Sequence, residues 1–190
     1  MGHSAGGHLA LLYAYMSAEG ATVIDPDDET KNIEFHDVQL VISEAGPTQF
    51  ATYENVLVHA DSFIYAMAGT THMGNGYLDA LSAVSPINYV NSSSPYTILA
   101  YGKVINDKDE VPDSDGVVPY SQAEVLETCL LCNGVWHNKC TLYGVGHNDF
   151  GEYFDNGVLY IKTVHPKNPD SAIQDYYNNI LTQLIILKNQ

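Results

Sequence analysis

The chain opens with MGHSAGGHLALLYAY, residues 1–15, in which glycines surround a serine and lead directly into an apolar run. Gly2, Ser4 and Gly6 fit the pattern G-x-S-x-G, which is typical of a serine in a sharp turn between a strand and a helix. The residues from Ala5 to about Ala18 are good helix formers. The stretch therefore predicts a strand-to-helix turn with a serine hydroxyl at its tip.

This turn has the features that nucleophilic chemistry needs. Gly2 and Gly6 are predicted to remove Cβ atoms that would collide across so sharp a bend, and Gly7 to let the helix pack closely on the sheet. Backbone N–H groups at the start of the helix, that of Ala5 first, favour developing negative charge. A second interpretation stays open at this point, in which Ser4 merely caps the helix.

Composition limits the classes of protein to which the chain can belong. A length of 190 residues predicts a single domain, residues 1–190, and a hydrophobic content of 45% indicates a globular fold. The net charge is -16, from 23 acidic and 7 basic residues, which argues against nucleic acid and anionic membrane surfaces as partners. No apolar run reaches the roughly 18 residues that a membrane span needs. The compartment stays open.

Strands and helices alternate along the chain. The predicted elements, in chain order, are a helix over 5–18, a polar loop over 25–31, a strand over 38–43, a helix over 77–84, a strand over 96–101, a helix from Pro119 to about Leu131, a strand over 139–143 and a helix over 172–188. Such alternation is typical of βαβ units. The predicted fold class is α/β, with a mostly parallel sheet and helices on both faces.

A serine hydroxyl needs a base and a group that orients the base, because it is a poor nucleophile at neutral pH. In one large class of α/β enzymes the chain order is serine, acid, histidine. The strand ending at Tyr101 is followed by a loop with four aspartates, which are Asp107, Asp109, Asp113 and Asp115. The strand ending at Tyr143 is followed by a short turn to His147. Both loops lie at carboxyl ends of strands, where ligands bind in such sheets.

Five segments carry a resemblance to a known family. They are GHSAGGHLALL (2–12), ISEAGPTQF (42–50), SPINYV (85–90), DGVVPYSQA (115–123) and YGVGHNDF (143–150). Together they resemble the α/β-hydrolase superfamily, in particular its esterase/lipase branch with carbohydrate-esterase-like and arylformamidase-like enzymes. The resemblance implies that Ser4 is the nucleophile, His147 the general base, Asp115 the residue that orients it, and the Ala5 N–H an oxyanion donor.

The acid is the least settled of these assignments. Asp115 matches the family pattern D-x-x-V-P, but the family usually shows His-Gly where this chain has Tyr101-Gly102. The acid also usually follows that glycine more closely, so a loop insertion, VINDKDEVPDS, is needed. Asp107 and Asp109 therefore remain alternatives to Asp115.

The resemblance also implies a part of the fold that would precede this chain. In the family several strands come before the serine turn, and a H-G-G motif supplies a second oxyanion donor. We therefore expect the chain to be the C-terminal half of such a hydrolase, beginning at an internal methionine, rather than a naturally minimal one. An open, apolar sheet edge that favours self-association would follow.

The expected function is hydrolysis of small-molecule carboxylic esters through an acyl-enzyme, with no cofactor and no metal. An amidase or peptidase of the same superfamily is one alternative. A truncated, non-catalytic chain that pairs with another subunit is the other.

Two cysteines and the histidines other than His147 are predicted to be structural. Cys129 and Cys132 form C-x-x-C, but the second pair that a zinc site would need is missing, so both are predicted to be buried in a helix. His3 occupies a free position of the serine motif and His8 lies one turn into the helix. The other histidines, His36, His59, His72, His137 and His165, lack metal-ligand spacing and are predicted to be surface or packing residues.

Overall fold

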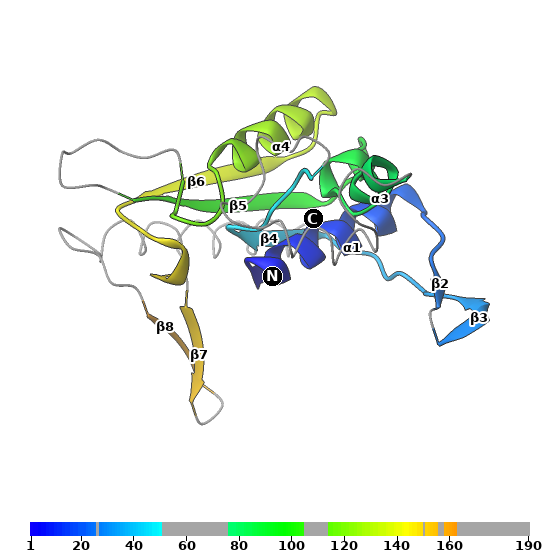
Figure 1. The fold of residues 1–190 in the computed structure, drawn as a ribbon, viewed down its shortest axis with the longest axis horizontal. Coiled ribbons are helices and arrows are strands. Elements are labelled where there is room, and N and C mark those ends of the chain that lie inside the picture. Colours follow the sequence, from blue (N-terminus) through cyan, green and yellow to red (C-terminus); the bar gives the residue numbers. More distant parts are fainter. Residues whose placement is uncertain (26, 51–75, 105–113, 150, 156–157, 163–190) are drawn as a thin grey trace.

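A four-stranded parallel sheet forms the centre of the computed structural model, which describes residues 1–25, 27–50, 76–104, 114–149, 151–155 and 158–162 (Figure 1). The sheet order is β1 (Gly2–His3), β4 (Leu40–Glu44), β5 (Tyr96–Lys103) and β6 (His137–Tyr143). The helical elements are α1 (Ala5–Glu19), α3 (Tyr77–Ala83), the 3-10 turns η2 (Pro86–Tyr89) and η3 (His147–Asp149), and α4 (Ser121–Cys132). The α/β prediction is confirmed.

The strand register brings the carboxyl ends of all four strands to one edge. β4 pairs with β5 from Leu40↔Tyr96 to Glu44↔Ala100, and β5 pairs with β6 as far as Lys103↔Tyr143. The short β1 adds the pairs Gly2↔Ser43 and His3↔Glu44. Loops that follow β1, β5 and β6 therefore start close together in space, although their residues are far apart in the sequence.

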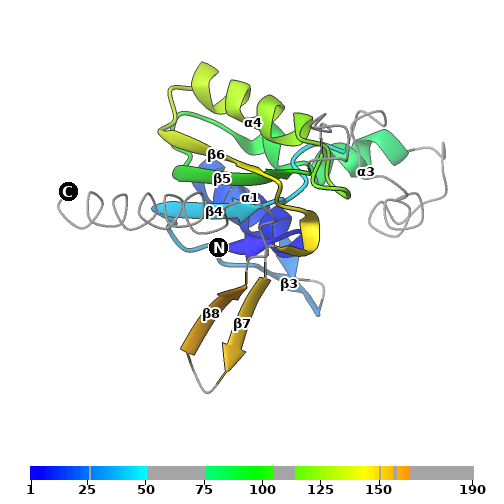
Figure 2. The ribbon, with the colours of Figure 1, turned by 90° about the vertical axis from the view of Figure 1, so that its left-hand side faces the viewer.

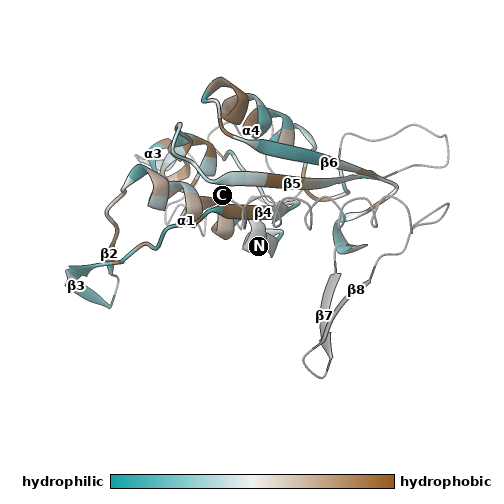
Figure 3. Cartoon of the chain, turned by 180° about the vertical axis from the view of Figure 1, so that it is seen from behind, coloured by the Kyte–Doolittle hydropathy of each residue, from teal (hydrophilic) through white to brown (hydrophobic). Residues whose placement is uncertain are grey.

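Apolar side chains cover both faces of the sheet. On one face α1 and α4 pack over the strands in a single cluster: Leu11, Ala14, Tyr15, Val41, Leu99, Tyr101, Val118, Tyr120, Ala123, Leu126, Leu130 and Val135. The other face carries Ile42, Ala45, Ile98, Ala100, Leu142 and Val145. Figure 3 shows the difference among the strands, since β4 and the middle of β5 are hydrophobic whereas β6 is mostly hydrophilic. The helix predicted over 172–188 lies outside the described residues.

Helix α1 follows the predicted limits and α4 does not. Gly20 ends α1 in the left-handed conformation, at φ 75°, and its N–H caps the last turn. The prediction that Pro119 opens the next helix is wrong, because α4 begins at Ser121. Pro119 instead forms an isolated antiparallel bridge with Ser114, two residues before the helix begins.

Two hairpins were not predicted. The polar segment 25–31 is part of an antiparallel hairpin, β2 (Ile24–Asp25) with β3 (Asp28–Asn32), and not a loop. A second hairpin joins β7 (Gly151–Asp155) to β8 (Val158–Lys162). Figure 1 shows both hairpins projecting from the body of the sheet, and Figure 2 shows the same for β7–β8.

The cysteine prediction is wrong in part. Cys129 and Cys132 do lie on α4, but Cys129 is only half-buried and Cys132 is exposed. The buried face of α4 runs through Ala123, Leu126 and Leu130, and Cys132 falls off that stripe. Within the described part of the chain, no helix has both the length and the apolar character of a membrane span.

Candidate active site

Ser4 lies in a strained turn between β1 and α1. Its backbone has φ 53° and ψ -121°, a combination that costs a non-glycine residue about 1–3 kcal/mol. The Ser4 N–H donates to the carbonyl of Glu44 at 2.8 Å, which fixes the turn to the end of the neighbouring strand. Since α1 begins at the next residue, Ala5, the N–H of Ala5 is among the helix N-terminal groups that have no acceptor within the helix.

Close packing around the turn explains two of its three glycines. A Cβ on Gly2 would lie 2.2 Å from the Gly6 oxygen, and a Cβ on Gly7 would lie 2.8 Å from Ser43 Oγ on β4. Both predictions are confirmed. The prediction for Gly6 is wrong, because a Cβ built there meets no atom within 4 Å. Gly6 contributes to the close contact through its carbonyl, which faces Gly2.

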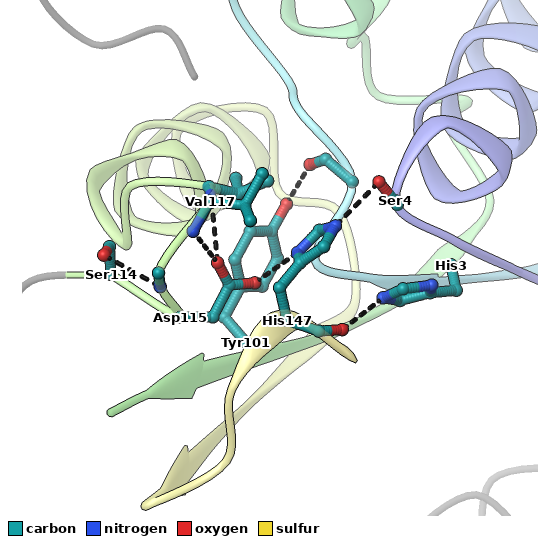
Figure 4. A network of polar contacts seen from close by, with 10 residues as sticks. His3, Ser4, Tyr101, Ser114, Asp115, Val117 and His147 are labelled. Atoms are coloured by element: carbon teal, nitrogen blue, oxygen red, sulfur yellow. Dashed lines mark hydrogen bonds and ion pairs between the residues drawn. The ribbon is translucent and has the colours of Figure 1, made fainter. Parts of the chain in front are cut away.

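The Ser4 hydroxyl points to a histidine and not to the helix. No side-chain cap bond forms between Ser4 and α1, which removes the interpretation of Ser4 as a mere helix cap. Instead Ser4 Oγ lies 2.9 Å from Nε2 of His147, and Nδ1 of His147 lies 2.8 Å from Oδ2 of Asp115 (Figure 4). A carboxylate only accepts, so His147 carries its proton on Nδ1 and leaves Nε2 free to accept from the Ser4 hydroxyl.

Asp115 is held by its own turn. Its Oδ1 accepts the N–H groups of Val117 at 2.9 Å and Val118 at 2.7 Å, while Oδ2 faces His147. The Asp115 side chain is 1% exposed and that of His147 is 10% exposed. The Asp115 carbonyl also accepts the backbone N–H of His147 at 2.8 Å. The acid therefore fixes both the ring and the main chain of the histidine.

The Tyr101-Gly102 pair at the end of β5 has a packing role. A Cβ on Gly102 would lie 2.0 Å from the Val145 carbonyl oxygen and 3.1 Å from Asp115 Cβ, so only glycine lets the His147 loop approach β5 this closely. The hydroxyl of Tyr101 donates to the Gly46 carbonyl, and complete burial raises the pKa of Tyr101 well above its ordinary range. Tyr101 is thus a neutral donor that ties β5 to the loop after β4.

His3 is a neighbour of the site that the sequence analysis left without a role. Its Nε2–H donates to the His147 carbonyl at 2.9 Å, and the two rings are tilted with centroids 4.8 Å apart. Burial, and then the nearby His147 ring, lower the pKa of His3 below its ordinary value of 6.5. The only sequence signal for this contact is that His3 directly precedes Ser4.

The structure thus brings together three of the predicted residues, Ser4, Asp115 and His147, at the carboxyl edge of the sheet. The alternative acids Asp107 and Asp109 lie outside the described residues. In the described ranges, no group of three or more histidine, cysteine or acidic side chains has the arrangement of a metal site.

Comparisons with known proteins agree with the α/β fold. No curated protein matches the chain. Among solved structures, esterase B from Lactobacillus Rhamnosis (HN001) is similar, with a TM-score of 0.56, 17% identity, and coverage of 100% of this chain and 52% of the esterase. A thermophilic esterase from the Planctomycetes species Thermogutta terrifontis has a TM-score of 0.58 and 16% identity over 98% of this chain and 53% of its own.

Its propionate-bound form is similar too, with a TM-score of 0.55 and 16% identity over 96% of this chain and 54% of its own. The chain thus spans about half the length of the solved esterases that it matches. The family model BD-FAE matches residues 1–130. The chain belongs to the BD-FAE family, a family of α/β-hydrolase-type esterases.

Proposed function

We propose that this protein is a serine esterase that hydrolyses small-molecule carboxylic esters through an acyl-enzyme. The observation that carries the proposal is the continuous chain of hydrogen bonds from Ser4 Oγ to His147 Nε2, at 2.9 Å, and from His147 Nδ1 to Asp115 Oδ2, at 2.8 Å. The strained backbone of Ser4 supports it, because such strain persists where a function requires it.

Acylation begins when Ser4 Oγ attacks the ester carbonyl carbon while His147 Nε2 takes the hydroxyl proton. The charge that develops on the carbonyl oxygen is stabilised by the Ala5 N–H at the start of α1. His147 then gives the proton to the departing alcohol oxygen, and the C–O bond to the alcohol breaks. The acyl group remains on Ser4.

Deacylation repeats these steps with water as the nucleophile. His147 takes a proton from water, the hydroxide attacks the acyl carbon, and the bond to Ser4 Oγ breaks as His147 returns the proton to that oxygen. The carboxylic acid leaves. Asp115 keeps its negative charge throughout and stabilises the His147 imidazolium that forms in each half-reaction.

Short acyl esters are the substrates to test first. The Thermogutta terrifontis esterase, which is similar in fold, has been solved with propionate and with butyrate bound. p-Nitrophenyl acetate, propionate and butyrate present acyl groups of this size. Matched p-nitroanilides test the amidase alternative, because an amide leaving group must be protonated more completely before it departs.

The Ser4→Ala variant tests the proposal. We expect hydrolysis of p-nitrophenyl propionate to fall by about 10⁴-fold or more, since removing a nucleophile from a Ser-His-Asp unit has effects of this size. Ser17→Ala is the matched control, because its hydroxyl donates to the His36 carbonyl near the other end of α1, and its activity should be unchanged. Full activity of Ser4→Ala would overturn the assignment.

Labelling by a small fluorophosphonate gives a second, independent readout. The reagent should attach to Ser4 in the wild-type protein and to nothing in Ser4→Ala, as mapped by peptide mass spectrometry. Absence of both hydrolysis and labelling in the wild-type protein would instead support a non-catalytic chain.

A further inference from the structure

The backbone of His147 is anchored at both of its peptide groups. Its N–H donates to the carbonyl of Asp115 at 2.8 Å, and its C=O accepts from Nε2–H of His3 at 2.9 Å (Figure 4). One anchor is therefore Asp115, the same residue whose carboxylate faces Nδ1 of the His147 ring. The other anchor is His3, which immediately precedes Ser4.

The second anchor matters because of where His147 comes from. His147 follows β6, and β6 is separated from β1 by β4 and β5 in the sheet. The loop from Gly144 to His147 must therefore carry the ring across the carboxyl edge to reach Ser4. The hydrogen bond from His3 to the His147 carbonyl fixes the end of this loop at a defined distance from the serine turn.

We propose that His3 is a positioning residue for His147, an inference that rests on the proposed esterase function. Nε2–H of His3 holds the His147 carbonyl, and so sets the separation between His147 Nε2 and Ser4 Oγ. Because His3 and Ser4 are consecutive, the same segment of main chain carries the nucleophile and the anchor of its base. A displacement of the serine turn then moves the base in the same direction.

The charge state of His3 suits this role. The two rings lie with centroids 4.8 Å apart, so a permanent cation at His3 would oppose the imidazolium that forms on His147 during the proposed reaction. Burial, and then the His147 ring, lower the pKa of His3, which favours its neutral form. A neutral ring with its proton on Nε2 still donates to the carbonyl and adds no charge beside His147.

Three substitutions separate the donor from the rest of the side chain. His3→Gln places an amide nitrogen the same number of bonds from the main chain as Nε2, whereas the nitrogen of His3→Asn stops one bond short. His3→Ala removes the donor entirely. We expect kcat for p-nitrophenyl propionate to fall by about 10- to 100-fold in the alanine and asparagine variants, with KM within about twofold, because a displaced base slows the chemical step and not substrate binding.

The glutamine variant should recover most of the lost rate. The matched control is His137→Gln, since His137 makes the same kind of bond, from Nδ1 to the Val135 carbonyl at 2.7 Å, at the opposite end of β6. Its kcat should equal that of the wild type. Wild-type kcat in both His3→Ala and His3→Asn, with Ser4 still labelled by fluorophosphonate, would overturn the proposal and leave the esterase function intact.

A readout that does not depend on turnover is the downfield NMR signal of the His147 Nδ1 proton, which is bonded to Asp115. It should be sharp in the wild type and in His3→Gln, and broadened by water exchange in His3→Ala and His3→Asn. An unchanged signal in all four proteins would also overturn the role of His3. Failure of the esterase function is recognised separately, by full activity in Ser4→Ala.

Discussion

The active-site edge of the sheet and the β2–β3 hairpin use similar side chains for very different connections. At the active-site edge, His147 bonds to residues 144 and 143 positions away, His3 and Ser4. In the hairpin, Asp28 Oδ1 accepts the N–H of Thr30, two positions away, at 3.1 Å. Both regions contain an aspartate that caps its own turn. Only at the sheet edge does the remaining carboxylate oxygen reach a distant element, and this is what converts a turn into a site.

The largest expected effect comes from a substitution of Asp115, the aspartate that reaches His147. Asp115→Asn keeps the turn, because an amide oxygen still accepts from Val117 and Val118, but its NH₂ faces Nδ1 of His147. The ring must then carry its proton on Nε2 and cannot accept from Ser4. We expect kcat for p-nitrophenyl propionate to fall by about 10⁴-fold.

Asp28→Asn is the matched control, since Asp28 caps a turn of the same kind and pairs only with Lys31 and Thr30 among the contacts described for it. Its kcat should be unchanged. Asp107→Asn and Asp109→Asn test the alternative acids. A large loss in either of these, with little loss in Asp115→Asn, would assign the acid to Asp107 or Asp109 instead.

A smaller effect is expected when the packing beneath the site is altered. In Gly102→Ala the new methyl would lie 2.0 Å from the Val145 carbonyl oxygen, so the loop that carries His147 must move. We expect about a 10²-fold lower kcat with most of the substrate affinity retained. Gly20→Ala provides the contrast, because its Cβ meets nothing but φ is 75°. It should lower the free energy of unfolding by about 1 kcal/mol without changing kcat; equal kcat in the two variants would contradict the packing role of Gly102.

The polar contacts of Gln122 also join residues that are far apart in the sequence, but we expect them to affect stability and not kcat. Gln122 on α4 accepts from the N–H groups of Thr48 and Gln49, each at 2.8 Å. Gln122→Leu leaves the buried Thr48 N–H without this acceptor, and we expect a loss of about 2–3 kcal/mol in urea unfolding followed by circular dichroism. Activity per folded molecule should stay near that of the wild type. A kcat loss as large as that of Gly102→Ala would show that the contacts of Gln122 are coupled to the active site.

The smallest expected effect is a pH dependence of stability. His8 is buried and its Nδ1–H donates to the Pro47 carbonyl at 3.1 Å. Burial lowers its pKa from the ordinary 6.5, so the unfolded chain binds the proton first as the pH falls. This contribution to stability is complete above pH 6.5 and is lost below it, at no more than about 1.4 kcal/mol per pH unit.

His8→Asn keeps a donor at the position of Nδ1 and removes the titration. Its free energy of unfolding should fall less steeply than that of the wild type between pH 6.5 and 5. Identical slopes for the two proteins would exclude His8 as a source of the acid sensitivity.

Much of the fold could be predicted because it rests on local patterns. The runs that became β4 and β5 are short, apolar and closed by turn residues, and α1 has strong helix formers ended by Gly20. The hairpin β2–β3 could not be predicted, since its strands are polar and exposed and show no apolar alternation. The start of α4 was placed two residues too early because Pro119 forms a bridge with Ser114, and helix propensity does not record such a contact.

The candidate site, too, contains residues that could be predicted from the sequence and contacts that could not. Ser4, Asp115 and His147 were found from a short motif, the order of residues and a family resemblance. The bond from His3 to His147 and the close approach at Gly102 are tertiary contacts, and their sequence signals are one residue each. A useful rule from this chain is that residues next to a predicted nucleophile are candidates for the site even when their own type suggests packing.

The positions of β1 and β6 in the sheet have a consequence for how the protein would lose activity on heating. Among the described strands β1 and β6 lie at the two ends of the order, so the residues that follow them, Ser4 and His147, depend on opposite ends of the sheet. Edge strands open locally at lower free energy than strands inside a sheet. Fraying of either strand would separate His147 from Ser4. The first step of thermal inactivation would then be a reversible separation of base from nucleophile, well before the hydrophobic core melts.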